Sequence, residues 1–151
     1  MRRNDREITD KTLIDQMILS EKVVRLGIMD NDKVYVVPMN FGYDGKTFYF
    51  HSALVGRKID LLKKTHYATF ELDRVGELVP GAVACGYSVN FESVIGEGRV
   101  EFIEDADEKR TALNLLMKHY TDKGDWDIPQ QALSSVCCFK LIVENISMKK
   151  R

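Results

Sequence analysis

A short polar and basic stretch near residue 50 carries the residue types best suited to chemistry. His51 and Ser52 end a strand-like run, and Gly56, Arg57 and Lys58 follow where a helical pattern begins. The first turn of a helix leaves backbone N–H groups without partners and carries a partial positive charge, so it favours anions. Arg57 and Lys58 can neutralise a phosphate, and Gly56 lets a ligand approach the backbone. This spacing predicts a phosphate site, and an ordinary charged helix start is the alternative.

A second stretch, Val37-Pro38-Met39-Asn40, interrupts another strand-like run. Proline removes one donor from a sheet ladder, so it indicates an edge or a break in the strand. Backbone groups freed by such a break, together with the Asn40 amide, can meet a planar heteroaromatic ring. An edge strand that simply contains a proline is the alternative interpretation.

The three histidines and the paired cysteines receive different interpretations. His51 lies beside the predicted anion site, where an imidazole can act as an acid, a base or a ligand. His66 follows a helical pattern and is expected to face solvent, and His119 lies near a helix C-terminus, where positive charge is favourable. The Cys and His spacings match no zinc site, so no metal is predicted. Cys137 and Cys138 are interpreted as reduced core residues.

The hydrophobic pattern predicts about six strands with few helices between them. Strands are expected at residues 22–29, 34–40, 47–51, 66–72, 88–103 and 136–146. Helices are expected after Asp10, at residues 56–64 and 106–120, and as a short turn at 129–133, whereas the glycine-rich residues 75–86 are expected to form a loop. The Asp44-Gly45 pair predicts a hairpin. Hairpin-like connections favour an antiparallel sheet or small barrel over a doubly wound parallel sheet.

Length and composition set further limits. The chain has 151 residues, of which 44% are apolar and 30% are charged, and its net charge is −1. We therefore expect one domain, residues 1–151, with a core that needs no disulfide or metal. The balanced charge argues against nucleic acid, and the apolar runs are far below the roughly 20 residues of a membrane span. Arg2-Arg3 is followed by polar residues and not by the apolar stretch of a secretion signal, which predicts a cytoplasmic protein.

Several motifs together resemble one known group of proteins. They are the opening residues 1–8, Arg25-Leu26-Gly27, the stretch from Tyr35 to Tyr43, Phe50-His51-Ser52-Ala53 with Gly56 and Lys58, and Ser93-Val94-Ile95-Gly96-Glu97-Gly98. In this combination the chain resembles the nitroimidazole-resistance (Nim-type) proteins. These belong to the wider group of flavin-binding proteins similar to pyridoxamine-phosphate oxidase. The motifs are spread over most of the chain.

The resemblance implies a fold, a cofactor and an assembly. The fold would be mainly β with flanking helices, a six-stranded antiparallel split β-barrel of the Greek-key type. The protein would be a homodimer that binds FMN in clefts at the subunit interface. By resemblance, Arg57 and Lys58 would hold the FMN phosphate with help from Ser52 and Gly56, the isoalloxazine edge would be lined by Val37, Pro38, Met39 and Asn40, and His51 would be the candidate catalytic residue.

Two departures from the oxidases themselves narrow the expected activity. The oxidases end with an Arg-Leu-x-Pro segment that helps to bind their substrate, and they carry basic residues in the strand that matches Val34 to Phe41. In this chain residues 144–151 contain no such segment, and no basic residue lies between Val34 and Phe41. Oxidation of vitamin B6 is therefore not expected. The resemblance instead implies an FMN-dependent oxidoreductase that reduces a small aromatic acceptor, such as a nitroimidazole or another nitro compound. The alternatives are a haem-binding split barrel with His51 or His119 as axial ligand, a non-catalytic flavin-binding or redox-sensing module, and a purely structural domain.

Overall fold

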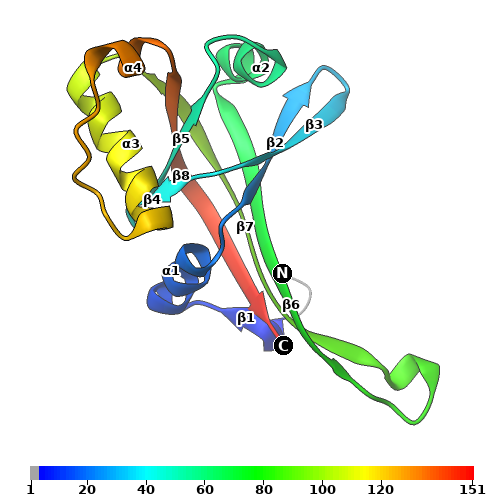
Figure 1. Ribbon diagram of the computed structural model, residues 1–151. Coiled ribbons are helices and arrows are strands. Elements are labelled where there is room, and N and C mark those ends of the chain that lie inside the picture. Colours follow the sequence, from blue (N-terminus) through cyan, green and yellow to red (C-terminus); the bar gives the residue numbers. More distant parts are fainter. Residues whose placement is uncertain (1–3) are drawn as a thin grey trace.

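Within residues 4–151, eight antiparallel strands form one sheet that curls around an apolar core (Figure 1). The computed structural model describes residues 4–151. The strand order is β3-β2-β6-β7-β8-β5-β4, and β1 pairs with β8. The strands are β1 (Glu7–Ile8), β2 (Val24–Asp30), β3 (Lys33–Met39), β4 (Gly42–Tyr43), β5 (Thr47–Ser52), β6 (Tyr67–Val79), β7 (Ser88–Ile103) and β8 (Cys137–Lys150). The helices are α1 (Lys11–Ser20), α2 (Arg57–Thr65), α3 (Ala106–Thr121) and α4 (Gln130–Ser134), with 3₁₀ turns at Asn4–Arg6 and Ala84–Gly86.

The predicted antiparallel sheet with flanking helices is confirmed, and the strand count differs from the predicted six. The six long strands begin close to their predicted starts, although β6 and β8 run further than predicted. Strands β1 and β4 have two residues each, too few to show a period. The sheet is not closed by hydrogen bonds, since β3 and β4 stand at the two ends of the strand order and do not pair with each other. Only Asn40 and Phe41 separate these strands in the chain, so the backbone itself passes from one edge to the other.

Buried aromatic rings occupy the centre of the core. Phe48 lies 5.3 Å from Phe41 and 4.8 Å from Phe70, and Phe50 lies 5.0 Å from Phe139, between ring centroids. Helices α1 and α2 close this core with apolar side chains that are buried among the same cluster. Because successive side chains of a strand alternate between faces, burial of Phe48 and Phe50 turns His51 outward.

Helices cover only part of the outer surface of the sheet. Figure 1 shows α3 and α4 together on one side, where a second apolar cluster joins α3 to β5, β7 and β8. The outward side chains of β3, β2, β6 and β7 form what we call the open face. Four large apolar side chains on this face are each more than half exposed: Met29, Val34, Val36 and Ile95. None of the helices described in residues 4–151 has both the length and the apolar character needed to span a bilayer.

The ends of β6 and β7 extend beyond the body as a two-stranded arm, residues 75–91 (Figure 1). This corrects the predicted loop of residues 75–86 in its first part only: β6 continues to Val79, which pairs with Ser88, and the connection that remains begins at Pro80. A bulge between Val75 and Leu78 accommodates Gly76, one of the three glycines that suggested a loop. Cross-strand pairing therefore overrides the local preference of this glycine-rich sequence.

Candidate functional site

The predicted phosphate-binding residues lie together where β5 passes into α2. His51 and Ser52 are the last residues of β5, and α2 begins at Arg57. Gly56 precedes the helix with a φ of +134°, a conformation that favours glycine. A Cβ atom built on Gly56 would meet no atom within 4 Å, so the space beside the helix start is open.

The start of α2 offers unpaired backbone donors to this space. Gly56 provides no side-chain cap. The first intrahelical bonds run from the N–H groups of Ile59 and Asp60 to the Gly56 carbonyl. The N–H groups of Arg57 and Lys58 therefore precede the hydrogen-bond ladder and point away from the helix. This arrangement is suited to an anion.

The two basic side chains at the helix start have different roles. The Arg57 guanidinium donates to the Asp30 carboxylate at 2.7 and 3.2 Å and lies 4.6 Å from the centre of the Tyr35 ring. Arg57 thus ties α2 to the β2–β3 hairpin. The Lys58 side chain is half-buried, and within residues 4–151 it makes no hydrogen bond or ion pair. Lys58 is therefore the cation that is free to meet an anionic ligand.

His51 and Ser52 border the same space. Burial, followed by the nearby Lys58 charge, lowers the pKa of His51 below its usual 6.5. The imidazole is therefore mainly neutral near pH 7 and can accept a proton or ligate a metal centre. The Ser52 hydroxyl donates to the Ala53 carbonyl at 2.8 Å, so it must turn from this bond to donate to a phosphate.

The second predicted stretch does not converge on the helix start as a unit. Val37 packs against the core, Pro38 is exposed on the edge strand, and Met39 is buried. The Asn40 amide donates to the Tyr120 hydroxyl at 3.1 Å and, more weakly, to the Lys22 carbonyl at 3.4 Å. These partners place Asn40 at the junction with α3.

Distance along the strand separates this stretch from the anion site. At about 3.3 Å per residue, Asn40 lies some 16 Å along the chain from Tyr35, the β3 residue that contacts Arg57. A ligand that reaches both stretches must therefore be elongated along β3. Asp30 and Tyr35 were missed as neighbours of the site, because only strand pairing brings the β2–β3 hairpin to α2.

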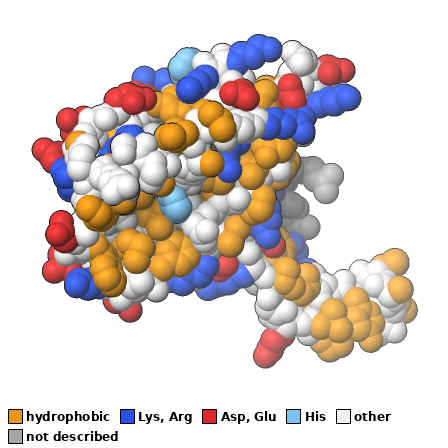
Figure 2. Space-filling model, turned by 45° about the horizontal axis from the view of Figure 1, so that its top comes forward, with side chains coloured by type: hydrophobic (Ala, Val, Ile, Leu, Met, Phe, Trp, Pro, Cys, Tyr) orange, Lys and Arg blue, Asp and Glu red, His pale blue; other side chains and the backbone are white. Residues whose placement is uncertain are grey.

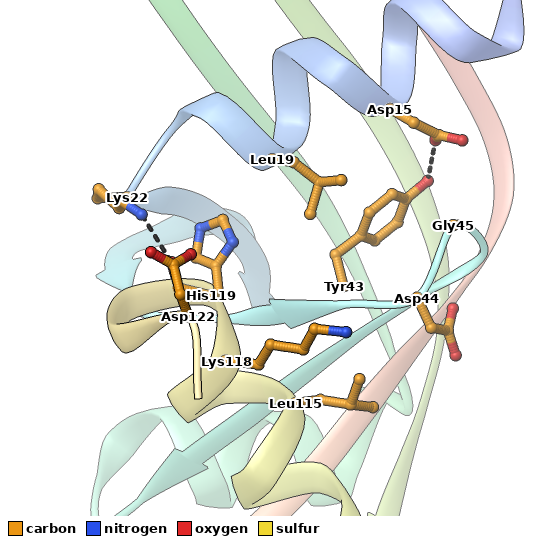
Figure 3. A pocket seen from close by; sticks show the side chains of 10 residues that line it. All are labelled: Asp15, Leu19, Lys22, Tyr43, Asp44, Gly45, Leu115, Lys118, His119 and Asp122. Carbon is orange, nitrogen blue, oxygen red and sulfur yellow. Dashed lines mark hydrogen bonds between the residues drawn. The ribbon is translucent and has the colours of Figure 1, made fainter. Parts of the chain in front are cut away.

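A separate cavity of about 580 Å³ lies between α1, α3 and the β4–β5 hairpin (Figure 3). None of the predicted cofactor-binding residues lines it. On its α1 side the Tyr43 hydroxyl donates to the Asp15 carboxylate at 2.9 Å, and Lys11 donates to the same carboxylate. Burial and this carboxylate raise the pKa of Tyr43, so the phenol stays protonated. These contacts tie α1 to the sheet.

His119 lies on the other side of this cavity (Figure 3). Its Nε2 lies 2.7 Å from the Glu21 carbonyl oxygen, and because a carbonyl only accepts, Nε2 must carry the hydrogen. The ring packs on Phe41, 4.6 Å between ring centroids. His119 thus joins α3 to the end of α1, and it would have to release Glu21 before Nε2 could ligate a haem iron.

The comparisons with known proteins agree with this architecture. A curled antiparallel sheet with a helix start at the end of one strand is the arrangement of the split-barrel class. Residues 10–150 match the family described as pyridoxamine 5'-phosphate oxidase, and the chain belongs to this family. A comparison with curated protein sequences gives no match.

Solved structures extend the comparison. A candidate 5-nitroimidazole antibiotic resistance protein from Bacteroides thetaiotaomicron is 37% identical, with a TM-score of 0.86, over 95% of this chain and 86% of that chain. This confirms the resemblance to the Nim-type proteins. The flavocytochrome Anf3 from Azotobacter vinelandii is 20% identical, with a TM-score of 0.85, over 100% of this chain and 72% of that chain. An FAD- and haem-binding protein from Mycobacterium smegmatis is 17% identical, with a TM-score of 0.88, over 96% and 73% of the two chains. The last two likenesses show the fold.

Proposed function

We propose that this protein binds FMN and uses it to reduce a small aromatic acceptor, such as a nitroimidazole or another nitro compound. The observation that carries the proposal is the unpaired, half-buried Lys58 at the uncapped start of α2, beside His51. A 37% identical structure is a candidate nitroimidazole resistance protein, which supports the class of acceptor. Flavin binding by split-barrel neighbours supports the class of cofactor.

The chain's own residues fit a flavin phosphate. Lys58 supplies a full positive charge, and the N–H groups of Arg57 and Lys58 supply fixed donors. Ser52 adds a hydroxyl once it turns from Ala53. Arg57 shares its charge with Asp30, so it contributes less to the phosphate than Lys58 does. The flavin ring would then extend along β3, past Val37 and Pro38, toward the end of the strand at Met39 and Asn40.

His51 is the proposed catalytic residue. When bound, the flavin supplies the electrons for reduction of the acceptor. The lowered pKa of His51 leaves its imidazole mainly neutral near pH 7, with one nitrogen that donates a hydrogen bond and one that accepts. The neutral side chain can therefore orient the acceptor by a hydrogen bond. Its protonated form, whose share grows as the pH falls, can donate a proton to the acceptor as it is reduced.

We further propose that the cofactor lies at the interface of a homodimer in the cytoplasm. The open face exposes Met29, Val34, Val36 and Ile95, and an exposed apolar patch is typical of a protein–protein interface. Packing of a second copy on this face would convert the open helix start into a cleft. The three cysteines are free thiols, which supports a reducing compartment.

An absorption spectrum of the purified protein, with identification of the cofactor released by acid, tests the proposal. A two-band yellow spectrum that yields FMN supports the site, and anaerobic reduction of a nitroimidazole by the prereduced protein supports the activity. A colourless protein that takes up no flavin on titration refutes both. Bound FMN without reduction of any nitro compound would favour the non-catalytic flavin-binding or redox-sensing module.

Haem binding is the second candidate function. Two structures of the same fold are a flavocytochrome and an FAD- and haem-binding protein. His51 favours this alternative in one respect, because it is partly exposed and mainly neutral, as an axial ligand must be. A haem-bound protein would show a sharp absorption band that disappears in His51→Ala, whereas His119→Ala would keep it.

A further inference from the structure

The arm of residues 75–91 exposes apolar surface far from the rest of its own subunit. Four of its side chains, Val75, Leu78, Val83 and Tyr87, are each more than half exposed. Glu77 is the one charged residue in this segment. Figure 2 shows hydrophobic side chains gathered on the arm, which stands clear of the body of the molecule. Exposed apolar surface of this kind marks an interaction site.

The apolar side chains of the arm continue the open face of the sheet. Val89, Phe91 and Ile95 project to the same side of β7, because alternate residues of a strand share a face. Val75 pairs with Phe91 and Leu78 pairs with Val89, so these two side chains lie on that side as well. The open face and the arm therefore form one surface that a single partner can cover.

The arm and the proposed flavin site lie at opposite ends of one strand. Helix α2 ends at Thr65, next to the start of β6 at Tyr67, and the arm begins near the other end of β6, which stops at Val79. These 13 residues span about 40 Å at about 3.3 Å per residue. A two-fold axis perpendicular to the strands reverses their direction in the partner. Two copies packed through their open faces about such an axis bring each arm to the partner's α2.

The two ends are complementary in charge and polarity. Helix α2 carries four basic residues and one acidic residue, and the arm carries a single acidic residue. The loop before α2 exposes Leu54 and Val55, the latter by 81%. An apolar, weakly acidic arm thus matches an apolar, basic end of the molecule.

We infer that the arm of each subunit crosses to the partner subunit, packs on the loop of residues 53–56 and forms one wall of the partner's cofactor cleft. The partner that the arm contacts is a second copy of this chain. The inference rests on the proposed function, since it completes the same flavin site. It assigns Val83 and Tyr87, near the tip of the arm, to the wall of a cleft whose phosphate end is built by the other subunit.

Disulfide trapping tests the crossing directly. Cys85 is an exposed thiol near the tip of the arm. In Val55→Cys, mild oxidation should link Cys85 of one subunit to the new thiol of the other and give a covalent dimer on a non-reducing gel. Addition of Cys85→Ala should abolish this dimer. Leu13→Cys is the matched control, since Leu13 is 44% exposed on α1, and this variant should give no more covalent dimer than the parent protein.

Equal trapping in Val55→Cys and Leu13→Cys, or a monomeric parent protein by light scattering, would overturn the inference. The trapping needs no flavin, so a colourless protein that still forms the Cys85–Val55→Cys dimer would reject the flavin and keep the crossing arm. A second variant, Val83→Asp, should weaken FMN binding at least tenfold, whereas Leu13→Asp should leave it unchanged. Equal FMN affinity in these two variants would show that the arm does not line the cleft.

Discussion

Replacement of Lys58 by alanine is the sharpest test of the site, because the structure separates the role of Lys58 from that of Arg57. Arg57 is already paired with Asp30 at 2.7 Å, and Lys58 makes no ion pair within the described residues. A hydrogen bond to a charged group contributes about 1.5–3 kcal/mol. At about 1.4 kcal/mol per tenfold change, Lys58→Ala should weaken FMN binding by about 10- to 150-fold.

Riboflavin, which has no phosphate, provides a matched ligand for this measurement. Fluorescence titration of the apoprotein should show a large loss of FMN affinity in Lys58→Ala and an unchanged affinity for riboflavin. Arg57→Ala should weaken FMN binding less than Lys58→Ala, since its charge is shared with Asp30. The double variant should lose FMN during purification and keep its circular dichroism spectrum.

Two results would refute the reasoning about Lys58. An equal loss of FMN and riboflavin affinity would show that Lys58 contacts the flavin ring or supports the fold, and not the phosphate. An unchanged FMN affinity would show that the phosphate binds elsewhere. Raised salt should weaken FMN binding to the parent protein and have less effect on the variant, because the screened charge is then absent.

Three further predictions concern the pH dependence and the fold. Burial and the nearby lysine lower the pKa of His51 from 6.5, so on acidification the unfolded chain takes up this proton before the folded one, and the free energy of unfolding should fall as the pH drops below 6.5. His51→Gln should make this free energy, measured by urea unfolding above and below pH 6.5, less dependent on pH. An unchanged pH dependence would contradict the prediction. Gly98→Ala would place a Cβ atom 2.0 Å from a carbonyl oxygen of β8 and should cost about 1–3 kcal/mol of stability in thermal unfolding. Gly76→Ala, whose nearest contact is 3.4 Å, should cost less, and equal losses would argue against this strand spacing. Tyr43→Phe removes the bond to Asp15 and should lower stability by about 1 kcal/mol without changing FMN affinity, so a loss of FMN affinity would place the adjoining cavity in the flavin site.

Local sequence predicted the β5–α2 part of the site, and long-range pairing decided the rest. His51, Gly56 and Lys58 lie within eight positions of one another, so a strand end followed by a helix start already places them together. Arg57 meets Asp30 only because the β2–β3 hairpin folds over α2. Asn40 meets Tyr120 across a separation of 80 residues. No local pattern signals either partner.

The arm shows that local sequence also fails to predict long-range strand pairing in the fold. Gly76, Pro80, Gly81 and Gly86 are typical of a loop, and they do surround its tip and bulge. The strand pairs on either side of the bulge are set by β7, whose alternation continues from the body of the sheet. A propensity assessed residue by residue takes no account of the neighbouring strand, so the prediction from sequence ended β6 too early.

The motifs shared with the Nim-type proteins divide into two kinds, and only one of them bears on function. A Cβ atom on Gly96 would lie 2.3 Å from the Phe70 ring, and one on Gly98 would lie 2.0 Å from the Ile142 carbonyl oxygen. These glycines are therefore required for β7 to lie close to the core and to β8, which any barrel of this spacing needs. Gly56 has no such packing role, since a Cβ atom there would meet no atom within 4 Å, and Lys58 beside it is unpaired within the described residues. Likeness at residues 93–98 thus supports the fold, and the proposed chemistry depends on residues 51–58.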